Sequence, residues 1–152
     1  MVILCDSREQ RCLDFSSFPA VTATKVVKLE FGDYACEFEG KLAGMKAPMH
    51  VERKSLSDCW GTMTTGYTRF RREIDRAKAS NMKLVLAIEA TYEDVLNGFE
   101  RSEFTGDSMV KKLATLWAKY GLETWYSGSR KLMARLIVEA FSAIGRGYAK
   151  TA

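Results

Sequence analysis

The sequence predicts a single α/β domain in which helices flank a central mixed β-sheet in three layers. Strands follow one another in the first third of the chain, whereas helices and strands alternate from residue 55 onward. That order is typical of layered α/β architectures. Residues 84–88 form an unbroken apolar run of strand length, which indicates a strand covered on both faces. The expected domain covers residues 1–152.

The first third predicts four short strands. Residues 2–5 form an apolar run that suits a buried strand. Residues 25–31 alternate between polar and apolar side chains, as a half-buried strand does, and residues 34–39 resume the pattern after a glycine. Residues 49–54 form a further strand. The last three strands in succession predict a meander.

A helix is predicted directly after the strand at 49–54. Ser55 and Asp58 have the spacing of a capping box, in which the serine accepts a backbone N–H and the acid reaches back to the cap. After an interruption at 64–66, a second helix is expected at about 67–81, with apolar and arginine side chains on separate faces.

The second half predicts two more helices around a short strand at 123–126. Gly121 ends the first helix, because glycine readily adopts the left-handed conformation. The last helix is expected at 130–144. The apolar face of the first is expected to consist of Val110, Leu113, Ala114 and Trp117, which have the spacing of an amphipathic helix.

Composition and charge exclude several classes of protein. With 47% hydrophobic and 28% charged residues, the chain is expected to fold, and no stretch approaches the roughly 20 apolar residues of a bilayer span. The amino terminus lacks the basic region of a signal peptide, so a reducing intracellular location is expected, cytoplasmic or with the nucleoid or nucleus. The net charge of +4 is too small by itself to indicate nucleic-acid binding.

The cysteines and the single histidine exclude further chemistry. Cys5, Cys12, Cys36 and Cys59 contain no C-x-x-C pair, so four buried free thiols are expected in place of a structural zinc site. His50 alone cannot supply a paired-histidine nuclease or an H-E-x-x-H protease. The H-x-E of zinc deaminases is matched at residues 50–52, but the P-C-x-x-C that completes that site is missing.

The candidate chemistry centres on Asp33, Glu52 and Lys54. Side chains alternate along a strand, so Glu52 and Lys54 point the same way and Arg53 points to the other face. A hairpin between the strands would set Asp33 beside Glu52. Such a cluster suits phosphodiester hydrolysis, in which carboxylates bind one or two Mg²⁺ ions and a lysine orients or deprotonates water, or steadies charge on the phosphate. The alternative is an exposed, salt-bridged hairpin.

A family resemblance is carried by six positions in a fixed order. With these positions the chain resembles the nuclease domain of the XPF family of structure-specific DNA endonucleases, whose signature is GD, a variable gap, then ERKxxxD. The similarity includes the opening D-x-R-E and extends over residues 1 to about 90. The six positions are Gly32, Asp33, Glu52, Arg53, Lys54 and Asp58.

The resemblance implies a restriction-endonuclease-like core of the PD-(D/E)xK superfamily and an endonuclease that uses Mg²⁺ or Mn²⁺ on branched or junction DNA. It implies Lys54 as the catalytic lysine. It also implies metal binding by Asp33 and Glu52, with Asp6 and Glu9 beside them, and DNA contacts by Arg8 and Arg53.

Two of these residues keep alternatives. By strand alternation, Arg53 faces away from Glu52, so a buried ion pair that holds the following helix is an equal expectation. Asp58 is either a helix cap or a partner of the site, and the cap is favoured.

Basic side chains on the helix at 67–81 are further candidates for DNA binding. Arg69, Arg72 and Arg76 are expected to contact phosphates. The alternative is a solvated helix face, because Glu73 and Asp75 are interleaved with them.

Two departures from the family affect the functional prediction. Residues 39–49 form an insertion that could reach DNA or a partner. The tandem helix-hairpin-helix module of many relatives is not found in residues 1–152, so a stand-alone nuclease, a homodimer or a nuclease with a DNA-binding partner protein is expected. The rival hypotheses are a catalytically silent subunit that dimerises or holds DNA, and a DNA-binding regulator whose site only binds metal.

Overall fold

The structure is a computed structural model that describes residues 1–99 and 102–151. Its six strands are β1 (Val2–Asp6), β2 (Ala23–Val27), β3 (Tyr34–Glu37), β4 (Met49–Lys54), β5 (Lys83–Ile88) and β6 (Glu123–Tyr126). Its helices are α1 (Leu56–Met63), α2 (Tyr67–Ala79), α3 (Tyr92–Asn97), α4 (Gly106–Tyr120) and α5 (Arg130–Thr151), with a 3₁₀ turn, η1 (Gly40–Leu42).

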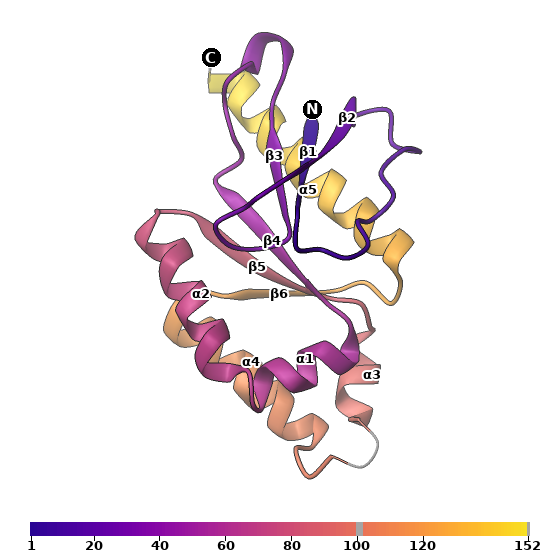
Figure 1. Ribbon diagram of the computed structural model, residues 1–152, viewed down its shortest axis with the longest axis vertical. Coiled ribbons are helices and arrows are strands. Elements are labelled where there is room, and N and C mark those ends of the chain that lie inside the picture. Colours follow the sequence, from indigo (N-terminus) through magenta and orange to yellow (C-terminus); the bar gives the residue numbers. More distant parts are fainter. Residues whose placement is uncertain (100–101, 152) are drawn as a thin grey trace.

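The strands form one mixed sheet in the order β2-β1-β3-β4-β5-β6. β3 pairs antiparallel with β1 and β4, and the other neighbours pair in parallel. Helix α5 covers one face, and α1, α2 and α4 cover the other (Figure 1). This arrangement confirms the predicted three-layer α/β fold. None of the helices in the described ranges is both long and apolar enough to cross a membrane.

The predicted meander is wrong for β2. This strand lies at the edge of the sheet and runs parallel to β1, because the long connection at 7–22 carries the chain back before the strand begins. The rest of the expected strand leaves the sheet. Leu29 packs against Val2 and Leu4, and Phe31 joins the core beneath α2.

Two separate cores cover the two faces of β4. The core on the α5 side includes Val51 and Phe141, and the core on the α1, α2 and α4 side includes Leu86 and Phe70. Burying each such side chain stabilises the fold by roughly 1.5–3 kcal/mol. Alternate residues of β4 therefore face different surroundings.

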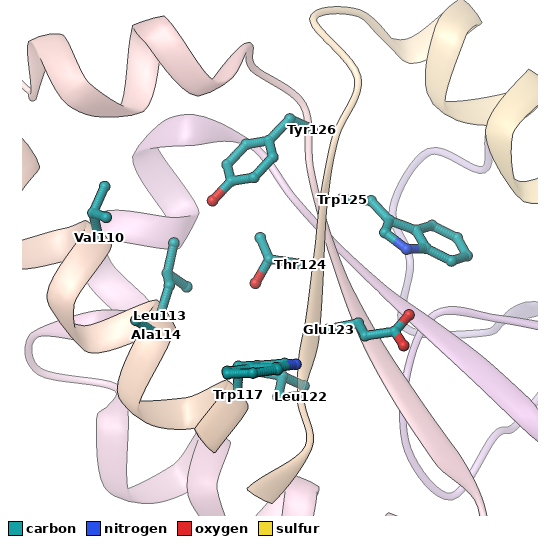
Figure 2. A pocket seen from close by; sticks show the side chains of 9 residues that line it. All are labelled: Val110, Leu113, Ala114, Trp117, Leu122, Glu123, Thr124, Trp125 and Tyr126. Atoms are coloured by element: carbon teal, nitrogen blue, oxygen red, sulfur yellow. The ribbon is translucent and has the colours of Figure 1, made fainter. Parts of the chain in front are cut away.

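The predicted apolar face of α4 is wrong in part. The helix buries Met109, Leu113 and Leu116, whereas Trp117 is 64% exposed. Leu113 belongs to both the predicted face and the observed buried face. The helix is rotated so that Met109 and Leu116, and not Trp117, point toward the sheet. Because β6 is the edge strand, an open apolar groove remains between it and α4, with Trp117 at one end (Figure 2).

The insertion at 39–49 lies at the edge of the sheet opposite the start of β3. The ring of Phe38 packs edge-on against Tyr148 of α5, with ring centroids 5.7 Å apart, and Tyr148 Oη donates to Lys46 O at 3.4 Å. A side chain at Gly145 would meet the Phe38 ring, with Cβ at 2.9 Å from it. The insertion is thus docked on α5.

Cys5 and Cys12 form a disulfide bond, so the expectation of four free thiols is wrong for this pair. The chain after β1 returns to the strand and brings the two Cα atoms to 6.4 Å. Arg130 holds this return by donating to Cys12 O at 3.2 Å. Cys36 and Cys59 are buried and free, as expected.

Candidate active site

The motif residues meet at one edge of the sheet. β1, β4 and β5 run in the same direction, so their carboxyl ends share this edge, and β3 begins there because it runs the opposite way. Asp6 ends β1, Asp33 directly precedes β3, and Glu52 and Lys54 lie at the end of β4. Sites in open α/β sheets gather at this edge.

Main-chain hydrogen bonds fix the position of Asp33. Its N–H donates to Val51 O and its carbonyl accepts from Asp6 N–H, both at 2.8 Å. The preceding Gly32 has a φ of 69°, and a Cβ there would lie 3.1 Å from that of His50. A glycine is therefore required in this turn, which presses Asp33 against β4.

Glu52 and Lys54 form an ion pair on the same face of β4. Glu52 is 5% exposed. Burial raises the pKa of Asp33 to about 6. Burial and the negative charge of Asp33 raise the pKa of Glu52 to about 8. Burial disfavours the charged form of Lys54, but Glu52 and Asp33 outweigh it and raise the pKa of the ammonium group, which stays protonated.

The donor set of this cluster fits a hard divalent cation. Asp33 and Glu52 supply carboxylate oxygens, the ligands that Mg²⁺ prefers. Burial raises the pKa of both carboxyls although Lys54 lies beside them, so a bound cation would favour their ionised forms. Within residues 1–99 and 102–151, no three His, Cys, Asp or Glu side chains are already arranged around a metal position. The fit therefore rests on two carboxylates.

A further carboxylate that the sequence did not single out lies beside this cluster. Oε1 of Glu73 in α2 accepts a hydrogen bond of 2.8 Å from Gly32 N–H. Its negative charge contributes to the raised pKa values of Asp33 and Glu52, after burial. The available signal was its place on α2 between the buried Phe70 and Ile74, next to the face that meets the sheet.

Arg53 faces the other side of β4, as strand alternation predicts. It donates to Glu89 Oε2 at 2.6 Å and to Glu9 Oε1 at 3.2 Å, and its side chain is 14% exposed. Arg130 of α5 adds a second cation, 3.7 Å from Glu89. The expected buried ion pair of Arg53 is present. Its acidic partners lie after β1 and β5, however, so the pair does not hold α1, the helix that follows β4.

The carboxylates of Asp6 and Glu9 bind arginines. They are therefore not part of the cluster that Asp33 and Glu52 form. The carboxylate of Asp6 accepts from Arg8 Nε at 2.6 Å and from Leu29 N–H at 2.6 Å. Burial raises the pKa of Asp6, but these hydrogen bonds outweigh it and hold the pKa below its ordinary value. The side chain of Arg8 stays 60% exposed.

Asp58 takes part in a helix cap, and three of the α2 arginines face solvent. Ser55 Oγ accepts from Asp58 N–H at 3.1 Å and donates to Asp58 Oδ2 at 2.7 Å, which confirms the helix cap. The acid reaches the hydroxyl of Ser55 and not its backbone N–H. Three arginines on α2 are exposed: Arg69, Arg72 and Arg76.

Comparisons with known proteins identify a family and a shared fold. The chain matches the ERCC4 domain over residues 5–140. It is similar in structure to XPF from Aeropyrum pernix, with 20% sequence identity and a TM-score of 0.67, over 91% of this chain and 63% of that one. XPF from Aeropyrum pernix in complex with DNA is similar over 99% of this chain and 66% of that one, with 22% identity and a TM-score of 0.64.

This chain thus spans less than two thirds of each of those two chains. At these identities the likeness shows a shared fold. No curated protein matches the chain.

Proposed function

Because the chain belongs to the ERCC4 domain family, we propose that it is a DNA endonuclease that requires Mg²⁺ or Mn²⁺ and cuts branched or junction-containing DNA. The observation that carries this proposal is the convergence of Asp33, Glu52 and Lys54 at the carboxyl edge of the sheet. The convergence brings together two hard metal ligands and a protonated amine, the groups that phosphodiester hydrolysis needs.

In this proposal Asp33 and Glu52 hold the metal. A divalent cation there would polarise the scissile phosphodiester and make a water molecule more acidic. Lys54, kept protonated by its carboxylate neighbours, would donate hydrogen bonds to the phosphate oxygens, where negative charge builds up during attack. The expected products carry a 5′-phosphate and a 3′-hydroxyl.

Exposed cations around the cluster would bind the DNA backbone. Arg8 is anchored by Asp6 yet largely exposed, so its guanidinium is held at the edge of the site. Arg69, Arg72 and Arg76 share one face of α2, the helix that reaches the site through Glu73. One of the structurally similar proteins is in complex with DNA, which supports this assignment.

The rival is a silent subunit that only dimerises or holds DNA. The presence of both carboxylates and the lysine argues against it, because a silent subunit has no need of a buried pair such as Glu52 and Lys54. An intracellular location, and a second copy or a DNA-binding protein as partner, belong to the same proposal.

A cleavage assay tests the proposal. Purified protein and its Asp33→Asn and Lys54→Ala variants would be incubated with forks, flaps, four-way junctions, duplex and single strands, in Mg²⁺, Mn²⁺ or EDTA. We expect metal-dependent cutting of branched DNA by the wild type and its loss in both variants. Cutting that survives either substitution would refute the site, and junction binding without any cutting would establish the silent subunit.

A further inference from the structure

Glu73 joins α2 to the turn that carries Asp33. Its Oε1 accepts from Gly32 N–H at 2.8 Å, across 41 positions of sequence. Phe70 and Ile74 bury the adjacent face of α2 under the sheet, so the backbone that carries Glu73 is itself fixed by packing. A rigid helix therefore presents one carboxylate to the turn.

This contact completes the restraint on the turn. On the sheet side, Gly32 lies so close to β4 that a Cβ would be 3.2 Å from Val51 O, and Asp33 N–H already donates to that carbonyl. On the helix side, Glu73 accepts the N–H of Gly32. The turn is held from both sides, which limits the positions that the Asp33 carboxylate can take.

Glu73 also adds negative charge where the proposed metal site needs it. Its charge acts on Asp33 and Glu52, and on the two cations Lys54 and Arg8. Asp75, two positions further along α2, is 54% exposed and lies 3.9 Å from Arg71. The two acids of the helix thus differ in role, since one faces the site and the other faces solvent.

We infer that Glu73 is a positioning residue of the active site, which fixes the Gly32-Asp33 turn by its hydrogen bond and strengthens cation binding by its charge. The inference rests on the proposed function, because it concerns the same metal site. Residues that orient metal ligands typically change metal affinity or activity by about 10–100-fold when they are replaced.

Three variants separate the two contributions. Glu73→Gln keeps a side-chain oxygen that can accept from Gly32 N–H but removes the charge, and Glu73→Ala removes both. Asp75→Asn removes the same charge from the solvent side of the same helix and is the matched control. Each protein would be measured for thermal unfolding in EDTA, for Mn²⁺ binding by electron paramagnetic resonance, and for cleavage against Mn²⁺ concentration.

We expect Glu73→Gln to unfold at the wild-type temperature, to bind Mn²⁺ about 10-fold more weakly and to retain most of its kcat at saturating metal. We expect Glu73→Ala to lose kcat as well, by about 10-fold or more, and Asp75→Asn to match the wild type. Wild-type Mn²⁺ affinity in Glu73→Gln, together with wild-type kcat in Glu73→Ala, would overturn the inference and leave the proposed function intact. A wild type that neither binds Mn²⁺ nor cuts DNA would overturn both.

Discussion

The backbone N–H of Arg53 donates a hydrogen bond of 2.7 Å to Oδ2 of Asp33. This bond ties the turn before β3 to the last residues of β4, so the two halves of the motif hold each other in place. Because the donor is main chain, it survives replacement of the Arg53 side chain, which binds Glu9 and Glu89 on the other face. Substitution of the Arg53 side chain therefore tests only its ion pairs with Glu9 and Glu89.

Arg53→Met should lower the free energy of unfolding by about 3–5 kcal/mol, because it leaves Glu9 and Glu89 with too little positive charge. Urea unfolding would measure the loss. The double variant with Glu89→Gln should recover part of it, since one of the uncompensated charges is then removed. An unfolding midpoint for Arg53→Met equal to that of the wild type would show that this network does not stabilise the fold.

Lys54→Ala should reduce kcat by about 10²–10³-fold at saturating metal, because the phosphate loses a charged donor. Lys83→Ala is the matched control. Lys83 pairs with Glu123 at 2.5 Å where β5 and β6 begin, at the edge of the sheet away from the site. Initial rates on a flap substrate would measure both variants. Similar losses in the two variants would contradict a specific role for Lys54.

Asp33 and Glu52 should make the metal-free protein less stable as the pH rises. The pKa values of Asp33 and Glu52 are raised to about 6 and about 8, so the folded state holds these protons more tightly than the unfolded chain. Their contribution is fully present below about pH 4 and is lost as the pH rises through those two values. We expect wild-type stability to drop by several kcal/mol relative to an Asp33→Asn, Glu52→Gln variant as the pH rises through these values.

Urea unfolding in EDTA at stepped pH would measure this difference. Mg²⁺ should restore wild-type stability at the alkaline end, because it binds ionised carboxylates, and should have little effect on the double variant. A wild type that gains stability over this range relative to the variant would reverse the predicted sign.

Single alanine substitutions of Arg69, Arg72 and Arg76 should weaken DNA binding equally across sequences, because phosphate contacts carry no sequence information. Each lost contact should reduce the slope of log affinity against log salt by about 0.9 on duplex DNA. Fluorescence anisotropy over a salt series would measure the slopes. Lys119→Ala, which removes an exposed cation from the end of α4, is the control, and an equal change in it would indicate a non-specific charge effect.

Loss of the Cys5–Cys12 disulfide should lower the free energy of unfolding by about 2–3 kcal/mol, the value expected for so short a closed loop. Cys12→Ala would be compared with the wild type by urea unfolding with and without a reducing agent. The two proteins should differ only without the reductant. A difference that persists under reduction would assign the effect to packing at Cys12.

Sequence patterns predicted the features that depend on neighbouring residues. The bounds of β4 and β6 and the cap at Ser55 are local, and the separation of Glu52 and Lys54 from Arg53 follows from strand alternation. The missed features depend on contacts between distant segments. Glu73 meets Gly32 across 41 positions, and no local pattern indicates which strand an edge strand such as β2 will join.

The different faces of β4 make strand register a determinant of chemistry. β4 pairs with β5 from Met49↔Lys83 to Lys54↔Ile88. A slip of one residue would move Glu52 and Lys54 to the face of Glu9 and Glu89 and would bring Arg53 to Asp33. Such a slip would disrupt both charged networks without changing the composition of the strand. Single-residue insertions within β4 should therefore abolish the site, whereas the exposed turn at Ala43 and Gly44 should accept them.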